Sequence, residues 1–130
     1  MKAKIHFIAD SDPKLVSHLT YILAKSKINI DDINVITLGD KTYIDLEVSD
    51  ERKAIKVLKA NGFQPSVSEC IIIQLEDKPG ELAKVSKILL DNKVEINRVD
   101  IIAKGLGRSI LALDVNKPKK AKTLLKKYLI

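Results

Sequence analysis

The 130-residue sequence has little of several features that would place a protein outside the cytoplasm. Its single cysteine, Cys70, excludes an intramolecular disulfide. No apolar run reaches the about 18 residues that a transmembrane helix needs. The first residues lack the long apolar segment and small-residue cleavage site of a signal peptide. We therefore predict a cytoplasmic protein that is not attached to a membrane.

Groups of residues that carry out catalysis or bind metals are also scarce. His6 and His18 have no cysteine or carboxylate at the spacing of metal ligands, so we expect no metal and no cofactor. The sequence contains no nucleophile motif, no phosphate-binding loop and no pair of carboxylates with a dedicated base. These absences predict that the protein is not an enzyme.

The charge of +6 is concentrated in the second half of the chain. Residues 66–130 have 13 Lys or Arg and 8 Asp or Glu, a balance of +5, and the run at 117–127 supplies most of it. A lysine-rich run of this length is typical of a solvated helix face, so it does not by itself indicate a nucleic-acid or membrane surface.

The apolar spacing of the first half predicts four strands, with one helix after the first strand and another after the third. The predicted strands cover residues 3–9, 28–38, 42–48 and 63–68. The first helix places Val16, Leu19, Ile22 and Leu23 on its inner face. The second begins after Asp50 as a cap and ends at Asn61-Gly62.

The same pattern begins again at residue 71. A shift of 66 residues aligns the halves as far as the glycine of the hairpin, and a shift of 67 aligns the rest. A register held over so many elements indicates a tandem repeat. We predict an α+β fold of two ferredoxin-like βαββαβ units packed side by side, at residues 1–68 and 69–130. The second unit ends where its fourth strand should begin, so that strand is truncated to residues 128–130 or missing.

The stretch at residues 71–89 contains most of the functional signal. Residues 71–75 form a buried strand, and a turn from Asp77 to Gly80 leads into an amphipathic helix. Asp77 can cap the helix or lie beside its N-terminus. Gly80 has no side chain, so a ligand can approach the backbone closely.

This stretch resembles the ACT domain family. The resemblance rests on the strand, on Asp77-x-Pro79-Gly80-x-Leu82, and on the residues Val-Glu-Ile-Asn at 94–97 that open the next strand. The two-unit arrangement is similar to stand-alone tandem ACT-domain proteins. The resemblance implies a regulatory protein without catalysis, whose units pair side by side and bind small ligands, typically amino acids.

The resemblance also implies where the ligand lies: between the turn of one unit and the second strand of its neighbour. Only the second unit has the complete turn, and only the first has the asparagine that contacts the ligand in the family, within Ile28-Asn29-Ile30. We therefore expect one composite site and one degenerate site. The composite site comprises Asp77, Lys78, Pro79, Gly80, Glu81, Leu82, Asn29 and Asp31, and the degenerate site comprises Asp12, Pro13, Lys14, Glu95 and Asn97.

Two other functions fit the same order of elements. An RNA-recognition module needs aromatic residues on its third strand, where this chain has Leu106 and Arg108, so nucleic acid is not the expected partner. A pure interaction module would use the exposed edges of the two small sheets to pair with copies or with another protein. The expected partners are a free amino acid or a similar small ligand, further copies of the chain, and a separate regulated enzyme or regulator.

Overall fold

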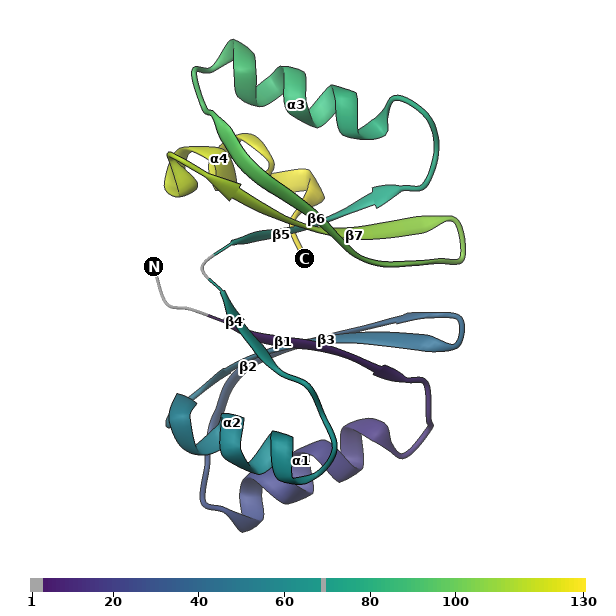
Figure 1. Ribbon diagram of the computed structural model, residues 1–130, viewed down its shortest axis with the longest axis vertical. Helices are drawn as coiled ribbons and strands as arrows, with labels where there is room; N and C mark the ends of the chain where they lie inside the picture. Colours follow the sequence, from purple (N-terminus) through teal and green to yellow (C-terminus); the bar gives the residue numbers. More distant parts are fainter. Residues whose placement is uncertain (1–3, 69) are drawn as a thin grey trace. The chain divides into compact units, whose positions relative to one another are not determined.

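The computed structural model describes residues 4–68 and 70–130, and the chain divides into two compact units, Met1–Glu69 and Cys70–Ile130 (Figure 1). Each unit is a small antiparallel sheet with helices on one face. The order of elements repeats between the units. The predicted α+β fold of two ferredoxin-like units is therefore confirmed.

The first unit contains four strands in the order β2-β3-β1-β4. Its elements are β1 (Lys4–Asp10), α1 (Leu15–Lys25), β2 (Ile30–Leu38), β3 (Lys41–Val48), α2 (Glu51–Ala60) and β4 (Ser66–Ser68). The strand β3 is central, because β1 pairs with it through Ile5 and Leu46, and β2 pairs with it through Val35 and Ile44. The fourth strand lies at the edge beside β1, which suits Pro65 just before it, since proline cannot donate a hydrogen bond to a neighbouring strand.

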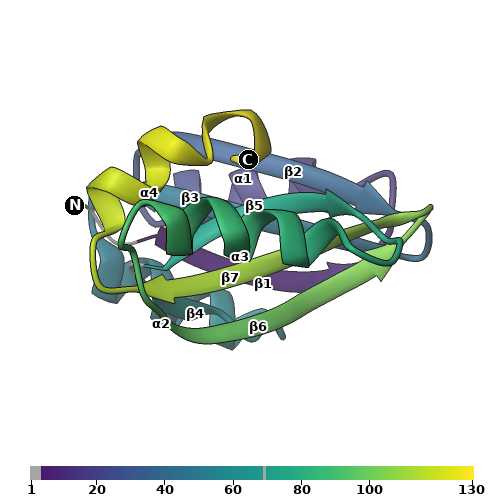
Figure 2. The ribbon, with the colours of Figure 1, turned by 90° about the horizontal axis from the view of Figure 1, so that it is seen from above.

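The second unit has three strands in the order β5-β7-β6, with α3 and α4 lying over the sheet (Figure 2). Its elements are β5 (Ile71–Glu76), α3 (Glu81–Asp91), β6 (Ile96–Gly105), β7 (Arg108–Val115), α4 (Pro118–Leu124) and the 3-10 helix η1 (Lys126–Tyr128). A single bridge between Ile73 and Leu129 occupies the place of the fourth strand. Within residues 70–130, the fourth strand of the second unit is therefore truncated, as predicted, to this single bridge.

Each unit has its own apolar core between its helices and its sheet. The first core includes Ile5, Phe7, Leu15, Leu19, Ile22, Leu23, Ile44, Leu46, Ala54 and Leu58, and the second includes Ile71, Ile73, Val85, Leu89, Leu111, Leu113 and Ala121. The prediction for Val16 is wrong, because its side chain is 41% exposed. Leu15 takes the inner position instead, since it lies one helical turn before Leu19.

Three helices end in the same backbone arrangement, in which an N–H group bonds the carbonyl five residues before it. After α2, Gly62 is left-handed (φ +87°) and the N–H of Phe63 donates to the oxygen of Leu58 at 3.0 Å, so the predicted cap is confirmed. After α1 and α3, the left-handed residue is a lysine, Lys27 or Lys93, each with φ +60°. These two lysines occupy equivalent positions of the repeat.

Within the described residues, no helix is both long and apolar enough to cross a membrane.

Replacing Lys27 or Lys93 with glycine should stabilise the protein. A residue with a Cβ loses about 1 kcal/mol or more in the left-handed conformation, and glycine does not. We expect each variant to gain about 1 kcal/mol in the free energy of unfolding, measured by urea denaturation. The control Lys87→Gly, in the interior of α3, should lose about 1 kcal/mol. Destabilisation of both left-handed variants would contradict this explanation of the helix ends.

Candidate functional site

The turn between β5 and α3 leaves the start of the helix without a side-chain cap. Gly80 is the N-cap residue, and its backbone is left-handed (φ 89°, ψ −12°). The alternative that Asp77 caps the helix is wrong, because the N-cap residue is Gly80 and the helix has no side-chain capping hydrogen bond. The carboxylate of Asp77 instead lies 3.3 Å from Nζ of Lys104. Among the described residues, neither the N–H of Gly80 nor that of Leu82 has an acceptor.

Lys78 is held at the turn by two carboxylates. Its ammonium lies 2.8 Å from Glu76 and 3.6 Å from Glu81. The hydrogen bond and charge of Lys78 lower the pKa of Glu76, and those of Glu76 raise the pKa of Lys78. The N–H of Glu81 donates to the oxygen of Lys78 at 3.4 Å, so this amide already has an acceptor within the turn. The N–H groups of Gly80 and Leu82 thus stay without an acceptor among the described residues, and the Asp77 carboxylate beside them is paired with Lys104.

The equivalent turn of the first unit is closed by its own side chains. Lys14 occupies the position of Gly80, and its N–H donates to Oδ1 of Asp12 at 2.8 Å. Ser11 occupies the position of Asp77, and its hydroxyl lies within hydrogen-bonding distance of Gly39 O (2.8 Å) and Thr42 Oγ1 (2.9 Å). The N–H of Lys14 and the side chain of Ser11, at the positions of Gly80 and Asp77, therefore already have hydrogen-bond partners within the first unit.

Both turns are fixed to the hairpin of their own sheet. The N–H of Asp77 donates to the oxygen of Gly107 at 2.8 Å, and the N–H of Ser11 donates to the oxygen of Asp40 at 2.9 Å. Each turn therefore lies at the end of the sheet where the second and third strands of its unit are connected.

The residues predicted to complete each site lie at the other end of the sheet, where the second strand begins. Asn29 and Ser49 exchange two hydrogen bonds there, both 2.9 Å, and Nδ2 of Asn29 donates to Oδ1 of Asp31 at 2.9 Å. In the second unit, Glu95 exchanges equivalent bonds with Asn116. No single unit therefore brings its turn and the start of its second strand together.

Asp31 and Asn97 lie in equivalent β-bulges. The register of β2 shifts between Ile30 and Asp32, and that of β6 shifts between Ile96 and Arg98. Both residues are exposed. A bulge changes the direction in which its side chain points, so these two positions are suited to contacts outside their own sheet.

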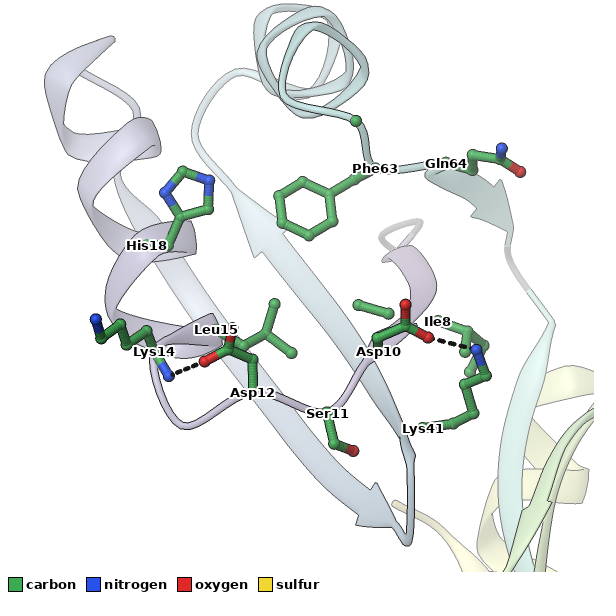
Figure 3. Close-up of a pocket in the computed structure, with 12 residues that line it drawn as sticks. Ile8, Asp10, Ser11, Asp12, Lys14, Leu15, His18, Lys41, Phe63 and Gln64 are labelled. Carbon is green, nitrogen blue, oxygen red and sulfur yellow. Dashed lines mark hydrogen bonds and ion pairs between the residues drawn. The ribbon is translucent and has the colours of Figure 1, made fainter.

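The first unit also contains a cavity of about 650 Å³ between the start of α1 and the segment that follows α2 (Figure 3). It is lined by Ile8, Ala9, Asp10, Ser11, Asp12, Lys14, Leu15, His18, Lys41, Gly62, Phe63 and Gln64. Two residues of the predicted degenerate site, Asp12 and Lys14, belong to this lining, whereas Pro13 does not. The cavity is formed entirely by residues of the first unit.

The polar groups of the cavity are partly paired with one another. Asp10 accepts a hydrogen bond from Lys41, and the bond and charge of Lys41 lower the pKa of Asp10. The imidazole of His18 and the ring of Phe63 lie 6.2 Å apart, and Phe63 packs on Phe7 with ring centroids 5.0 Å apart. The cavity thus combines an aromatic wall with charged groups.

Four residues of the cavity, His18, Phe63, Asp10 and Lys41, are not predicted as site residues from the sequence. The signal available was their position: His18 follows the first turn of a predicted helix, and Phe63 opens the predicted edge strand. Pairing of that edge strand with β1 brings the two segments to one side of the first turn. A search for family motifs alone does not reveal this proximity.

A polar cluster centred on Asp45 is structural. The side chain of Asp45 is 1% exposed and accepts hydrogen bonds of 2.9 Å from Tyr43 and Asn34. Burial, followed by the charge of Asp45, raises the pKa of Tyr43. His6 lies opposite Asp45 in the sheet, and burial lowers its pKa. Among the described residues, no group of three His, Cys, Asp or Glu could hold a metal ion.

Comparisons with known proteins give one family and a set of related folds. The family described as an ACT domain pair matches residues 7–129. A protein from Bacteroides thetaiotaomicron is 25% identical, with a TM-score of 0.54 over 96% of this chain and 86% of that one. The regulatory subunit of aspartate kinase from Thermus flavus is 15% identical, with a TM-score of 0.52 over 96% and 90%.

The ligand-free regulatory subunit of aspartate kinase from Thermus thermophilus is 16% identical, with a TM-score of 0.50 over 97% of this chain and 91% of that one. At these identities, the two Thermus structures show a shared fold. No curated protein matches the chain.

Replacing Lys41 with methionine should raise the pKa of Asp10 toward its ordinary value of 3.8, because the ammonium that stabilises the carboxylate is lost. A carboxyl whose pKa is lowered in the folded protein contributes stability at pH values above its ordinary pKa. That stability disappears as the pH falls through the folded-state pKa. The difference in stability between wild type and variant should therefore vanish in acid. A carbon-13 NMR titration of the Asp10 carboxyl tests this, and an unchanged pKa in the variant would contradict it.

Proposed function

Because the chain belongs to the family of ACT domain pairs, which is typical of small-molecule-binding regulatory proteins, we propose that it binds a free amino acid and thereby regulates a separate protein. The observation that carries this proposal is the uncapped start of α3 beside the carboxylate of Asp77. An amino acid has a carboxylate that needs donors and an ammonium that needs an acceptor. The turn at residues 77–82 offers both.

The carboxylate of the ligand would bind at the helix start. The N–H groups of Gly80 and Leu82 have no acceptor among the described residues, and the helix dipole favours an anion at this end. The space where a Cβ of Gly80 would stand is open, with no atom within 4 Å. A ligand can therefore approach the backbone closely, as Pro79-Gly80 predicts.

The ammonium of the ligand would bind at Asp77. Lys104 now lies 3.3 Å from this carboxylate, and both side chains are partly exposed, so the existing ion pair is weak. A carboxylate accepts several hydrogen bonds, so the ligand can share Asp77 with Lys104.

We further propose that Asn29 and Asp31 complete the site. They start the second strand of the first unit, whereas residues 77–82 follow the first strand of the second unit. One ligand can contact both only where opposite ends of two sheets meet, within one chain or between two copies. The corresponding combination of Lys14 with Glu95 and Asn97 is the weaker candidate, since Asp12 already binds the amide of Lys14.

Association of copies and a separate regulated partner also belong to the proposal. The edge strand β6 exposes Val99 (37%) and Ile101 (56%), and exposed apolar residues on an edge strand favour pairing with another chain. Ligand binding would then act by its difference in affinity between two arrangements of the units or copies. The partner would be a separate cytoplasmic protein.

Thermal unfolding with each common amino acid tests the proposed function. A ligand at about 100 times its dissociation constant should stabilise the folded protein by about 2.7 kcal/mol, which raises Tm by several degrees. Asp77→Asn should reduce this shift, because the acceptor for the ammonium loses its charge. Substitutions at Gly80 are less informative, since a side chain is strained at its φ of +89°.

The matched control is Asp91→Asn, which removes the same charge at the far end of α3. This variant should keep the full ligand-induced shift. Absence of a shift with every amino acid would contradict the proposed function and favour an interaction module. An undiminished shift in Asp77→Asn would contradict the proposed site and place ligand binding elsewhere.

A further inference from the structure

We propose that the cavity of the first unit binds a small organic cation with an apolar body, whose primary ammonium group meets Asp12 and whose apolar part lies on Leu15 and Phe63. The cavity contains no residue of the turn at 77–82. This site is therefore separate from the amino-acid site proposed above, and the chain would carry two binding sites of different construction.

The size and lining of the cavity suit a small ligand. Its volume of about 650 Å³ falls within the about 300–1,000 Å³ that is usual for small-molecule sites. Leu15 is 8% exposed, and Ile8, Ala9 and Phe63 are half-buried. The ring of Phe63 is fixed by its packing on Phe7. An apolar ligand body can thus be covered without rearrangement of the core.

The charges that face the cavity select a cation. Asp10 and Lys41 pair with each other, so their charges largely cancel. Oδ1 of Asp12 accepts the N–H of Lys14, but Oδ2 accepts nothing from the described residues. In Figure 3 the side chain of Lys14 extends away from Phe63. Asp12 and Lys14 are thus the lining charges that form no ion pair among the described residues, and only Lys14 extends away from the aromatic wall. The carboxylate of Asp12 is therefore the charge available to a ligand, and the face of Phe63 adds a weaker attraction for a cation.

The second repeat has lost this combination. The residues at the positions of Asp12, Leu15 and His18 are Lys78, Glu81 and Lys84. Glu81 pairs with both lysines, at 3.6 Å and 3.3 Å. The apolar lining and the open carboxylate are thus particular to the first unit, and they do not follow from the repeated fold alone.

The test uses the full chain labelled with nitrogen-15 and two sets of matched probes. The first set is 3-methylbutylamine, leucine and 4-methylpentanoate, and the second is 2-phenylethylamine, phenylalanine and 3-phenylpropanoate. Each set keeps one apolar body and presents it as a cation, a zwitterion or an anion. We expect at least one amine to shift the amide signals of Leu15, His18, Phe63 and Gln64, and neither acid to do so.

Two variants locate the binding. Asp12→Asn keeps the acceptor for the N–H of Lys14 but removes the charge, and it should weaken binding by about 10- to 100-fold, as for loss of a charged hydrogen bond. Gln64→Trp places a large ring at the exposed rim of the cavity and should also weaken binding. Asp91→Asn removes the same charge at a position that does not line the cavity, and it should leave binding at these amides unchanged.

The outcomes separate the two proposals. Binding of a zwitterion at these amides, with the same loss in Asp12→Asn, would support the cavity and identify amino acids as a source of its ammonium group. The cavity proposal is overturned if no probe shifts these amides at millimolar concentration, if the acids bind as well as the amines, or if Asp12→Asn binds like wild type. If the proposed amino-acid site fails, the evidence will instead be amide signals of residues 78–82 that do not shift when an amino acid is added.

Discussion

Pairing of the central strand with two antiparallel neighbours is the constraint on which the rest of each unit depends. β3 holds β1 on one side and β2 on the other, and β7 holds β5 and β6 in the same way. Because the first strand ends beside the hairpin, the turn into the first helix must lie there too. The start of the second strand then falls at the opposite end of the sheet. One ligand can therefore contact a turn and the start of a second strand only if these come from two different units.

The two units share one backbone fold but differ in the groups at the turn between their first strand and first helix. In the second unit, Gly80 leaves the start of the helix open. In the first unit, Asp12 closes the equivalent turn and keeps one carboxylate oxygen beside the cavity. The fourth strand adds to this asymmetry, because β4 follows Phe63 in the first unit, whereas a single bridge between Ile73 and Leu129 takes its place in the second. Sequence differences at a few positions therefore give the two units different groups at equivalent turns.

The fold could be predicted from the sequence because the register of the repeat is carried by core residues. Leu23 and Leu89, for example, are equivalent and fully buried. Features that depend on neighbours in space were not predicted. Val16 and Leu15 both fit the apolar spacing of α1, and only the packing of the helix on the sheet decides that Leu15 is the buried one. The cavity was missed because Phe63 meets His18 only when the edge strand pairs with β1.

The central claim is that the turn of the second unit and Asn29 of the first unit share one ligand. Paramagnetic relaxation tests it directly, with a spin label on Lys84→Cys in a Cys70→Ser background. At a saturating amino-acid concentration, the account predicts broadening of the amide signals of Asn29 and Asp31. Samples that mix labelled and nitrogen-15 chains distinguish contact within one chain from contact between copies. Unbroadened signals in both samples would contradict the composite site.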